Sequence, residues 1–489
     1  MKRNKKVYII LAFFIILITA LSVRRVMQND LFFTIATGRE MLANGYDNMD
    51  HLTWHEGLTF YKLRWAFDMI MTLLYNSTGF TGIYIFVMII AVITMLSLFY
   101  ILIKQKNNVV LAFIATVCSS LIMAGIGTFT ARAQIISYLC LLLEVFFIER
   151  LLMTNKKRYY LYLFLISVFI VNFHASVWPV TIILVMPFLA EAILNKIIKK
   201  KKDIKLVIED LKIKPLLITI ILLLAGSLVS PIGTYTYIYM FKVMGGISSE
   251  FILELQPTNL LTSVGMCSML VVYVIIALST KAKIKVRDLL LFFGLFIMAI
   301  LAVRNQSFFF IIGMIPLTRL VNNFFETYDD ENLLEKLVNK LNKNSVLTLL
   351  GVLILICMIP AIIERTTEEY VDKTAYPVDA TEYILNNLDY ENMRIYNHFN
   401  FGSYLELNGI KAFLDSRSEI FCKEFNDVEI LQDWLDVYNG KVHYDDLFDK
   451  YDIDYAIVYN TERINTYLNK DENYNKLYED DYFSIYERK

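Results

Sequence analysis

Charge is scarce in this sequence. Asp, Glu, Lys and Arg make up 19% of its 489 residues, whereas about a quarter of an average soluble domain is charged. Apolar residues account for 56% of the chain, and many of them gather in runs of about 20 residues, the length of a helix that crosses a bilayer. The composition therefore excludes an ordinary soluble protein and predicts a membrane protein.

Cysteine motifs and a net charge are missing as well. The five cysteines form no C-x-x-C motif and no pairing pattern, which excludes a disulfide framework and a cysteine metal site. The 47 basic and 48 acidic residues leave a net charge of −1, so no global field points to a nucleic acid as partner. No small-residue cleavage site of the A-x-A kind follows the first apolar run. We therefore interpret this run as a retained first helix and not as a signal peptide.

About eleven apolar segments before residue 363 have the composition of membrane-spanning helices. Their approximate ranges are 7–23, 80–103, 108–126, 132–152, 159–174, 177–195, 215–231, 259–280, 288–303, 306–322 and 345–363. Basic residues concentrate in alternate connections, such as the loop KIIKKKKDIK and the stretch KAKIKVR. Because Lys and Arg mark the cytoplasmic side, this pattern places the N-terminus inside. The prediction is a mainly α, multi-pass protein of the cell membrane.

A long polar loop, residues 24–79, then lies on the outer side between the first two spans. Residues 30–44 have helical periodicity and predict an amphipathic helix on the bilayer surface, which Gly45 would end. Residues 65–78 predict a second helix of this kind. The loop is rich in carboxylates and contains two of the five histidines, His51 and His55, so we place the chemistry here.

The composition changes after residue 363, where the chain becomes charged and aromatic and has no further span. The segments MRIYNHF, KAFLDS and YDIDYAIVYN predict strands, and ATEYILNNL, DVEILQDWLDVY and ERINTYLNK predict helices. This alternation is typical of a small α/β domain. We expect a transmembrane domain over 1–363, which includes the outer loop, and an extracytoplasmic α/β domain over 364–489.

Asp30 is the sharpest candidate for a catalytic side chain. It lies about one turn beyond the first span, at the boundary between membrane and water, where a water-soluble group and a lipid-borne group can meet. As a base or an electrostatic partner it could activate a hydroxyl for attack on an activated sugar carbon. The alternative is a helix-end or N-cap aspartate, which stabilises a helix by roughly 0.5–2 kcal/mol.

Further polar residues fall at the outer ends of later spans. Arg132 and Gln134 begin one span, His174 ends the next, and Arg304 and Asn305 end another. Arginine offers a planar fork of donors suited to a phosphate or pyrophosphate. Alternatively, these arginines reach lipid headgroups without any other role, and His174 is a capping or packing residue.

The order of these motifs resembles that of the GT-C glycosyltransferases. Asp30, Ala36, Glu40 and Gly45 follow the pattern of their first outer loop. GT-C enzymes are multispanning proteins that take sugars from polyprenyl-phosphate donors, and the aspartate after their first span is catalytic. The resemblance therefore implies this role for Asp30.

A bacterial group of multi-pass proteins with a C-terminal extracytoplasmic domain is more similar still. The matching pieces, spread over nearly the whole chain, are Asp50 with Thr53, Arg64 with Trp65, Arg132 with Gln134, Asn172 with His174, Arg304 with Asn305, and Asp415 with Arg417 and Glu419. We assign substrate binding to Arg64, Trp65, Arg132, Gln134, His174, Glu254, Arg304, Asn305, Asp415 and Arg417, of which all but Glu254 belong to the matching motifs.

Some features depart from the superfamily pattern. Leu31 stands where members often have Glu directly after the aspartate. Members that use a divalent metal carry two acidic motifs, and Glu254 or Asp50 could supply the second, but no spacing in the sequence is that of a ligand set. We therefore assign no metal ligand and leave a divalent cation open. Asp415 and Arg417 either line an acceptor site or form a surface ion pair worth about 0–1 kcal/mol.

The function expected from this resemblance is hexosyl transfer from a polyprenyl-phosphate sugar to an envelope glycan, lipid or protein outside the cell. Its partners would be the donor, membrane lipid and the acceptor. The alternative is a transporter, flippase or assembly factor for envelope polysaccharide, although the chain lacks the internal repeat that is common in transporters. A third option is a structural or signalling membrane protein whose outer domain binds a ligand.

Overall fold

The computed structural model describes residues 5–197, 205–243, 252–261, 263–341 and 343–489. Its contacts divide the chain into two compact units. The helical unit comprises Met1–Arg24, Tyr84–Thr236 and Ile252–Glu368, and the mixed unit comprises Arg25–Ile83, Tyr237–Phe251 and Glu369–Lys489. The outer loop that we grouped with the membrane helices thus shares its contacts with the C-terminal segment.

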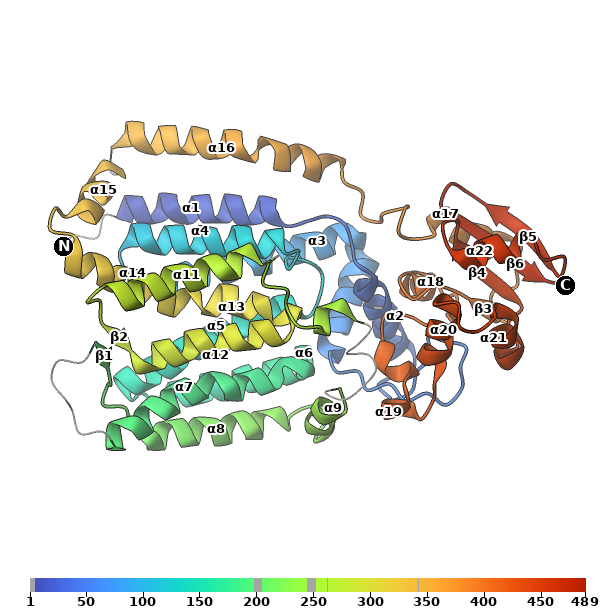
Figure 1. Cartoon of the computed structure of the whole chain (residues 1–489), viewed down its shortest axis with the longest axis horizontal. Coiled ribbons are helices and arrows are strands. Elements are labelled where there is room, and N and C mark those ends of the chain that lie inside the picture. Colours follow the sequence, from blue (N-terminus) through green and yellow to red (C-terminus); the bar gives the residue numbers. More distant parts are fainter. Residues whose placement is uncertain (1–4, 198–204, 244–251, 262, 342) are drawn as a thin grey trace. The chain divides into compact units, whose positions relative to one another are not determined.

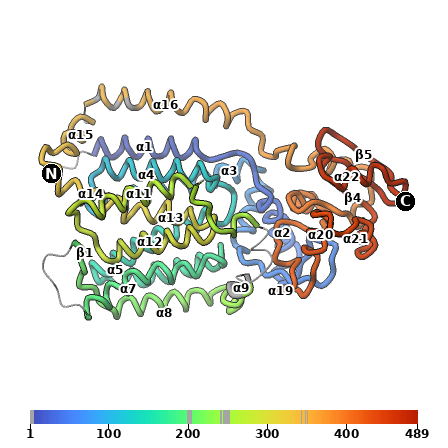
Figure 2. Tube along the Cα trace, viewed as in Figure 1, coloured from blue at the N-terminus to red at the C-terminus, as the bar shows by residue number. Residues whose placement is uncertain are grey.

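The helical unit is a bundle whose long helices run side by side (Figures 1 and 2). Its elements are α1 (Lys5–Ser22), the second part of α3 (Trp65–Lys104), α4 (Val109–Gly125), α5 (Gln134–Thr154), α6 (Arg158–Phe173), η1 (Ala175–Val177), α7 (Trp178–Ile197), β1 (Leu206–Val207), α8 (Ile213–Ser227), η2 (Leu253–Leu255), α11 (Val264–Ser279), β2 (Ile284–Lys285), α12 (Val286–Leu301), η3 (Val303–Asn305), α13 (Gln306–Ile312), α14 (Met314–Tyr328), α15 (Leu333–Leu341) and α16 (Asn344–Thr367). Helix α9 (Tyr235–Val243) crosses the boundary between the units.

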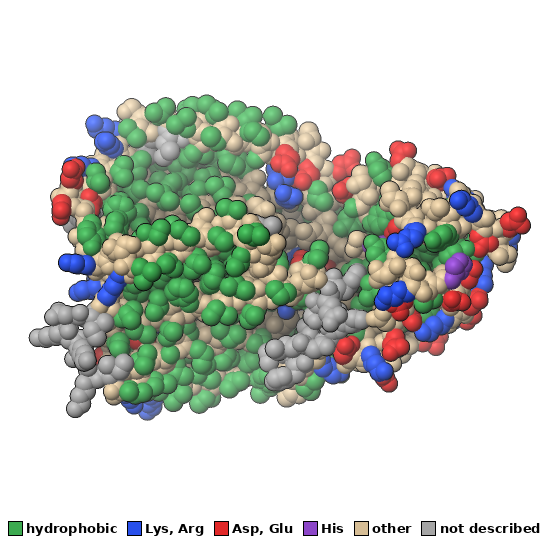
Figure 3. Space-filling model, in the orientation of Figure 1, with side chains coloured by type: hydrophobic (Ala, Val, Ile, Leu, Met, Phe, Trp, Pro, Cys, Tyr) green, Lys and Arg blue, Asp and Glu red, His purple; other side chains and the backbone are tan. Residues whose placement is uncertain are grey.

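Each apolar segment predicted to span the membrane coincides with a helix or a helix pair. Within the described residues, three helices are long and apolar enough to cross a membrane by themselves: Lys5–Ser22, Trp65–Lys104 and Ala175–Ile197. A fourth span results if α13 and α14, with the turn before them, count as one helix bent by 41°. Hydrophobic side chains cover most of the face of this unit seen in Figure 3. The chain is therefore a mainly helical membrane protein, and the count of eleven spans stays a prediction.

The mixed unit contains a four-stranded sheet of strand order β3-β4-β6-β5. Strand β3 (Ile395–Tyr396) is parallel to β4 (Tyr455–Tyr459), and β6 (Phe483–Arg488) is antiparallel to both β4 and β5 (Tyr474–Glu479). Its other elements are α2 (Asn29–Asn44), the first part of α3, α17 (Val378–Asn387), α18 (Gly402–Leu407), η4 (Ser418–Phe421), α19 (Lys423–Asn426), α20 (Ile430–Tyr438), α21 (Tyr444–Tyr451) and α22 (Arg463–Leu468).

One strand prediction in this unit was wrong, and two strands were not predicted. The segment KAFLDS, residues 411–416, forms no strand and makes one isolated bridge, between Ala412 and Thr53. Strands β5 and β6, which the sequence reading left out, pair with each other across a turn at 480–482. Short polar strands such as YNKLYE lack the apolar alternation that makes a strand visible in a sequence.

Helix α2 has the predicted bounds but not the predicted setting. Gly45 ends it with a positive φ of 85°. However, all residues from Leu31 to Gly38 are buried, so this stretch has no solvent-exposed face. It is therefore not an amphipathic helix lying on a membrane surface. It packs against α18 within the mixed unit. Its Phe33 joins loop residues Leu58 and Phe60 in the same core as the C-terminal segment.

Helix α2 also lies very close to the first part of α3. A Cβ atom on Gly38 would come within 2.1 Å of Thr72 Oγ1 and 2.5 Å of the Asp68 carbonyl oxygen, and the Thr72 hydroxyl donates a hydrogen bond to the Ile35 carbonyl. Only glycine permits this approach. Helix α3 then breaks at Gly79, whose φ is 63°, so the predicted helix 65–78 ends at this residue and the predicted span follows it.

Candidate functional site

Asp30 is the second residue of α2, in the first turn of the helix. The N-cap is Gln28, and its side chain makes no capping hydrogen bond. Of the alternative offered for Asp30, the N-cap position is therefore wrong, whereas its place at the helix end is confirmed. A carboxylate in a first helical turn is favoured by the helix dipole by about 0.3–1 kcal/mol. Next to it, the Asn29 side chain donates a 3.2 Å hydrogen bond to the Phe399 carbonyl oxygen. The half-buried carboxylate of Asp30 thus sits where α2 is tied to the C-terminal segment.

Arg64 and Trp65 begin α3 in the same unit. The Arg64 guanidinium lies 4.1 Å from the centre of the Phe33 ring, and its Nε is 3.4 Å from the buried Asp68 carboxylate. Trp65 donates its backbone N–H to the Lys62 carbonyl oxygen at 3.1 Å. Phe33 lies one turn after Asp30 on α2, so Arg64 reaches the same part of this helix.

Arg417 is the centre of a buried ion network. Its guanidinium donates to Asp415, to Glu406 at 3.0 Å and to Asp50 at 2.5 Å, and it lies 4.7 Å from the Phe60 ring centre. Arg417 is 2% exposed and Asp415 is 0% exposed. A surface ion pair, which the sequence reading kept as the alternative, is therefore wrong.

The charges in this network decide its protonation. Burial opposes ionisation of Asp50, but the Arg417 charge and hydrogen bonds from Thr53 outweigh burial and lower the pKa of Asp50. Burial and the neighbouring Asp415 raise the pKa of Glu406 well above its usual range. The Arg417 guanidinium thus faces Asp50, whose carboxylate is ionised, and Glu406, which holds its proton. Every nitrogen of the guanidinium has a carboxylate partner, so Arg417 is occupied in this structure.

In the helical unit, Arg132 and Glu254 meet. Arg132 lies just before α5 and donates a 2.5 Å hydrogen bond to Glu254 of η2. The two side chains are 25% and 45% exposed, so the ion pair faces solvent. The backbone N–H of Val303 in η3 donates to the Gln256 carbonyl oxygen, one residue beyond η2. The segments that carry Arg132, Glu254 and Arg304 are therefore neighbours.

The other predicted residues of the helical unit also lie at helix ends. His174 ends α6, and its Nδ1 is 2.8 Å from the Ser137 hydroxyl in the first turn of α5. Gln134 is the first residue of α5. The Asn305 side chain donates to the Met298 carbonyl oxygen at 3.1 Å. Asp30 belongs to the other unit, so the prediction that Asp30, His174 and Arg304 line one cavity stays a prediction.

A divalent cation finds no ready ligand set. Within the described ranges, no group of three or more His, Cys, Asp or Glu side chains could hold a metal ion. Of the two acids considered as a second motif beside Asp30, Glu254 lies in the other unit and Asp50 is paired with Arg417. The cation therefore stays a hypothesis without an assigned site.

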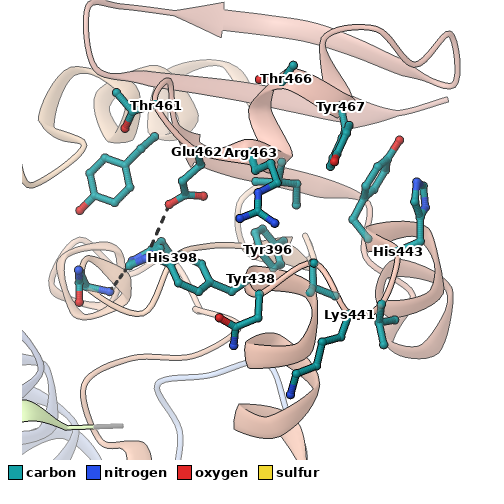
Figure 4. A pocket seen from close by; sticks show the side chains of 18 of the residues that line it. Tyr396, His398, Tyr438, Lys441, His443, Thr461, Glu462, Arg463, Thr466 and Tyr467 are labelled. Atoms are coloured by element: carbon teal, nitrogen blue, oxygen red, sulfur yellow. Dashed lines mark hydrogen bonds and ion pairs between the residues drawn. The ribbon is translucent and has the colours of Figure 1, made fainter.

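The sequence reading missed a second ion network, inside the helical unit. Arg319 of α14 donates to Glu149 of α5 at 2.7 Å and to Asp288 of α12. Arg287 donates to Glu191 of α7 at 3.1 Å. These ion pairs link helices α5, α7, α12 and α14. Their sign in the sequence was single acidic and basic residues within apolar segments. It also missed a pocket in the C-terminal segment, lined by His398 and Glu462 (Figure 4).

Comparison with known proteins finds a similar architecture among solved structures. No protein-family model matches the sequence, and no curated protein matches it. Among solved structures, the apo form of the Archaeoglobus fulgidus oligosaccharyltransferase superposes with a TM-score of 0.56 and 11% identity, covering 94% of this chain and 69% of that one. The same enzyme tethered to an acceptor peptide containing the NVT sequon gives a TM-score of 0.60 and 10% identity, with the same coverage. The chain has a GT-C fold.

The GT-C fold gives the two units a common context. The superposition covers 94% of this chain, and it therefore includes residues from both units. At 10–11% identity the likeness concerns the fold. What the chain binds and transfers is argued from its own residues.

Proposed function

We propose that this protein is a membrane glycosyltransferase that moves a sugar from a polyprenyl-phosphate donor to an acceptor outside the cell. The observation that carries the proposal is the GT-C fold, shared over 94% of the chain with an enzyme named for oligosaccharyl transfer. The proposed acceptor is an envelope glycan, lipid or protein. The proposed setting is the cell membrane, with the N-terminus in the cytoplasm and the C-terminal segment outside.

Asp30 is the proposed catalytic residue. It orients or deprotonates the acceptor hydroxyl, which attacks the anomeric carbon of the donor and displaces the polyprenyl phosphate. The oxygen–carbon bond to the acceptor forms as the bond to the phosphate oxygen breaks, and the proton leaves through the carboxylate. Support comes from its half-buried place in the first turn of α2, just after the first apolar helix.

Arg132 and Arg304 are proposed to hold the donor phosphate, with Gln134, His174 and Asn305 around them. Their support is their common placement at the ends of α5, α6 and η3. Glu254 keeps the Arg132 guanidinium in place while the site is empty, and a phosphate, which accepts hydrogen bonds from arginine in the same forked geometry, takes its position when the donor binds. The solvent-facing ion pair between the two supports this exchange.

Asp415 and Arg417 have a different part in the proposal. Because every nitrogen of the guanidinium already has a carboxylate partner, Arg417 holds the segment of Asp50 against the C-terminal segment and shapes the acceptor side without touching the acceptor. Arg64 and Trp65 support α2 from the start of α3, beside the helix that carries Asp30.

The test is transfer activity of the purified full chain in detergent. Radiolabelled polyprenyl-phosphate glucose, mannose and galactose are each offered with a membrane extract as acceptor. Loss of a general base costs about 10²–10⁴-fold in rate, so D30N should lower transfer by about 100-fold or more. Asp379 is the second residue of α17 as Asp30 is of α2, and D379N is the matched control with unchanged activity.

Two results would contradict the proposal. Transfer by D30N at the wild-type rate would remove Asp30 from the chemistry. A wild-type protein that moves the labelled lipid across the bilayer of proteoliposomes, yet transfers no sugar, would instead make the chain a flippase or transporter.

A further inference from the structure

A pocket of about 1100 Å³ opens in the C-terminal segment of the mixed unit, and the proposed transfer does not use it. Residues from β3, α20, α21, β4, α22 and the turns beside them line it. Five of these residues are tyrosines, namely Tyr396, Tyr438, Tyr444, Tyr459 and Tyr467. Tyrosine joins a flat apolar ring to a polar hydroxyl, so the lining suits a ligand that has both apolar faces and many polar groups.

Two of the tyrosines in this lining are about half exposed. Tyr438 is 47% exposed, and one face of its ring stacks on the buried Trp434 at 4.9 Å and 14°. Tyr467 is 49% exposed and stacks in the same way on the buried Tyr444, at 6.2 Å and 16°. In each pair a buried ring fixes the exposed one from behind. Because a neighbouring ring already holds each exposed ring in place, a ligand that stacks on it costs little further conformational entropy.

His398 and Glu462 form an uncharged polar pair between these walls. Burial lowers the pKa of His398 to about 4 and raises the pKa of Glu462 to about 8. His398 Nδ1 accepts a hydrogen bond from the Asn400 backbone N–H at 2.9 Å, so the neutral ring carries its proton on Nε2.

The two side chains face each other without touching. His398 Nε2 is 3.7 Å from Glu462 Oε1, which is too long for a hydrogen bond. Glu462 Oε1 is buried and accepts no hydrogen bond from the described part of the chain. A donor and an acceptor at this separation fit a hydroxyl group that bridges them, as a water molecule does between polar groups that lie too far apart.

Arg463 adds a fork of donors to the pocket. Its side chain makes no hydrogen bond or ion pair with the residues that the structure describes. The guanidinium lies against the turn at Gly440, where φ is +74° and where a Cβ atom would come within 2.6 Å of Nη1. Figure 4 shows it between the side of Glu462 and His398 and the side of Tyr467 and His443.

From these contacts we propose that the pocket binds an oligosaccharide. One sugar ring lies on Tyr438 and another on Tyr467, a sugar hydroxyl bridges His398 and Glu462, and Arg463 donates to the oxygen atoms between the rings. A purely apolar ligand would leave His398 and Glu462 without a bridging partner, which is costly because their side chains are only 8% and 12% exposed. A polyphosphate would need several free cations, and the other nearby cation, Lys441, is already paired with Asp436 at 3.1 Å. The site does not depend on the proposed transfer activity.

Binding of the full-length protein in detergent to an array of immobilised neutral and acidic oligosaccharides tests the proposal. The wild type should bind a group of related saccharides. Loss of a stacked ring costs about 0.5–1.5 kcal/mol, so Y438A should weaken binding up to about tenfold, and R463Q should weaken it as well. Y438F keeps the ring and should bind like the wild type, which separates stacking from a fault in folding.

Matched controls come from the same unit. Tyr482 is 45% exposed and does not line the pocket, so Y482A should bind like the wild type, as should K470Q. D30N should also bind normally, so a failure of the transferase proposal and a failure of this one give different results. A wild type that binds no saccharide would overturn the proposal, and so would Y438A and Y467A proteins that bind like the wild type.

Discussion

The guanidinium of Arg417 donates a 2.5 Å hydrogen bond to the carboxylate of Asp50, 367 positions earlier in the chain. The motif around Asp50, in the loop after the first apolar helix, and the motif around Arg417, in the C-terminal segment, are thus two halves of one buried cluster. Together with Phe33 and Phe60 of the loop, this ion pair makes residues 25–83 part of the fold of the C-terminal segment.

Replacement of Arg417 by leucine should destabilise the mixed unit strongly. It leaves Asp50, Asp415 and Glu406 buried together without a counter-charge, and removing one partner of a buried ion pair typically costs about 3–5 kcal/mol. Three of the four tryptophans, Trp54, Trp65 and Trp434, lie in this unit, so urea unfolding followed by tryptophan fluorescence reports it.

The control for this variant is K373L. Lys373 also forms an ion pair, with Asp379 at 2.9 Å, but both side chains are about half exposed. The unfolding midpoint of K373L should match that of the wild type. If R417L and K373L had the same midpoint, the buried network would not stabilise the unit.

The Arg132–Glu254 ion pair predicts opposite effects of two substitutions. R132Q removes a phosphate donor and should raise the KM for the polyprenyl-phosphate sugar by about 10–100-fold, since a hydrogen bond to a charged group contributes about 1.5–3 kcal/mol. E254Q removes the competing carboxylate and should leave this KM unchanged or lower it. The measurement is steady-state transfer at varied donor concentration.

The kinetics of E254Q distinguish a placeholder role of Glu254 from a catalytic role. A large loss of kcat in E254Q, with KM unchanged, would give Glu254 a role in the transition state and contradict its assignment as a placeholder. K242Q, a change to a cation in the last turn of helix α9, should alter neither constant.

The stability of the mixed unit should fall between pH 6.5 and pH 8 because of Glu462. Its pKa is about 8 in the folded protein against 4.5 in a free chain, and that of His398 is about 4 against 6.5. The folded state keeps a proton on Glu462 that the unfolded chain releases, so the free energy of unfolding falls as the pH rises from 4.5 to 8. His398 has the opposite effect between pH 4 and 6.5, and the two cancel where their ranges overlap.

The expected fall is up to about 2 kcal/mol, at about 1.4 kcal/mol for each pH unit. E462Q should remove it, and urea unfolding at pH 6.5 and pH 8 measures the difference. E382Q, which changes an exposed carboxylate on α17, should keep the wild-type fall. An equal fall in E462Q would mean that Glu462 ionises normally in the folded protein.

Much of the fold was readable from local patterns. The apolar runs located the helices of the bundle, because the tendency of such a run to leave water depends only on its own residues. Gly45 and Gly79 ended helices where a positive φ was needed, and that preference also belongs to a single residue. The order of the motifs also indicated the GT-C fold, which the structure shares.

The sequence alone could not show which polar residues are buried or which groups surround them. Arg417 has the same composition around it as an exposed arginine would have, and its burial depends on Asp50, Glu406 and Phe60, which other parts of the chain provide. Helix α2 looked amphipathic for the same reason, since the residues that cover its polar side come from α18 and the C-terminal segment.

By itself the sequence determined a mainly helical membrane protein, the positions of its helices and the residues able to do chemistry. Only the tertiary structure decided that Arg417 is enclosed, that Arg132 faces Glu254, and that Tyr438, Tyr467 and Arg463 share one pocket. The physical reason is the distance along the chain over which each effect acts. Hydrophobicity and backbone preference act within a few residues, whereas burial, ion pairing and pocket shape arise from contacts between segments that are hundreds of positions apart.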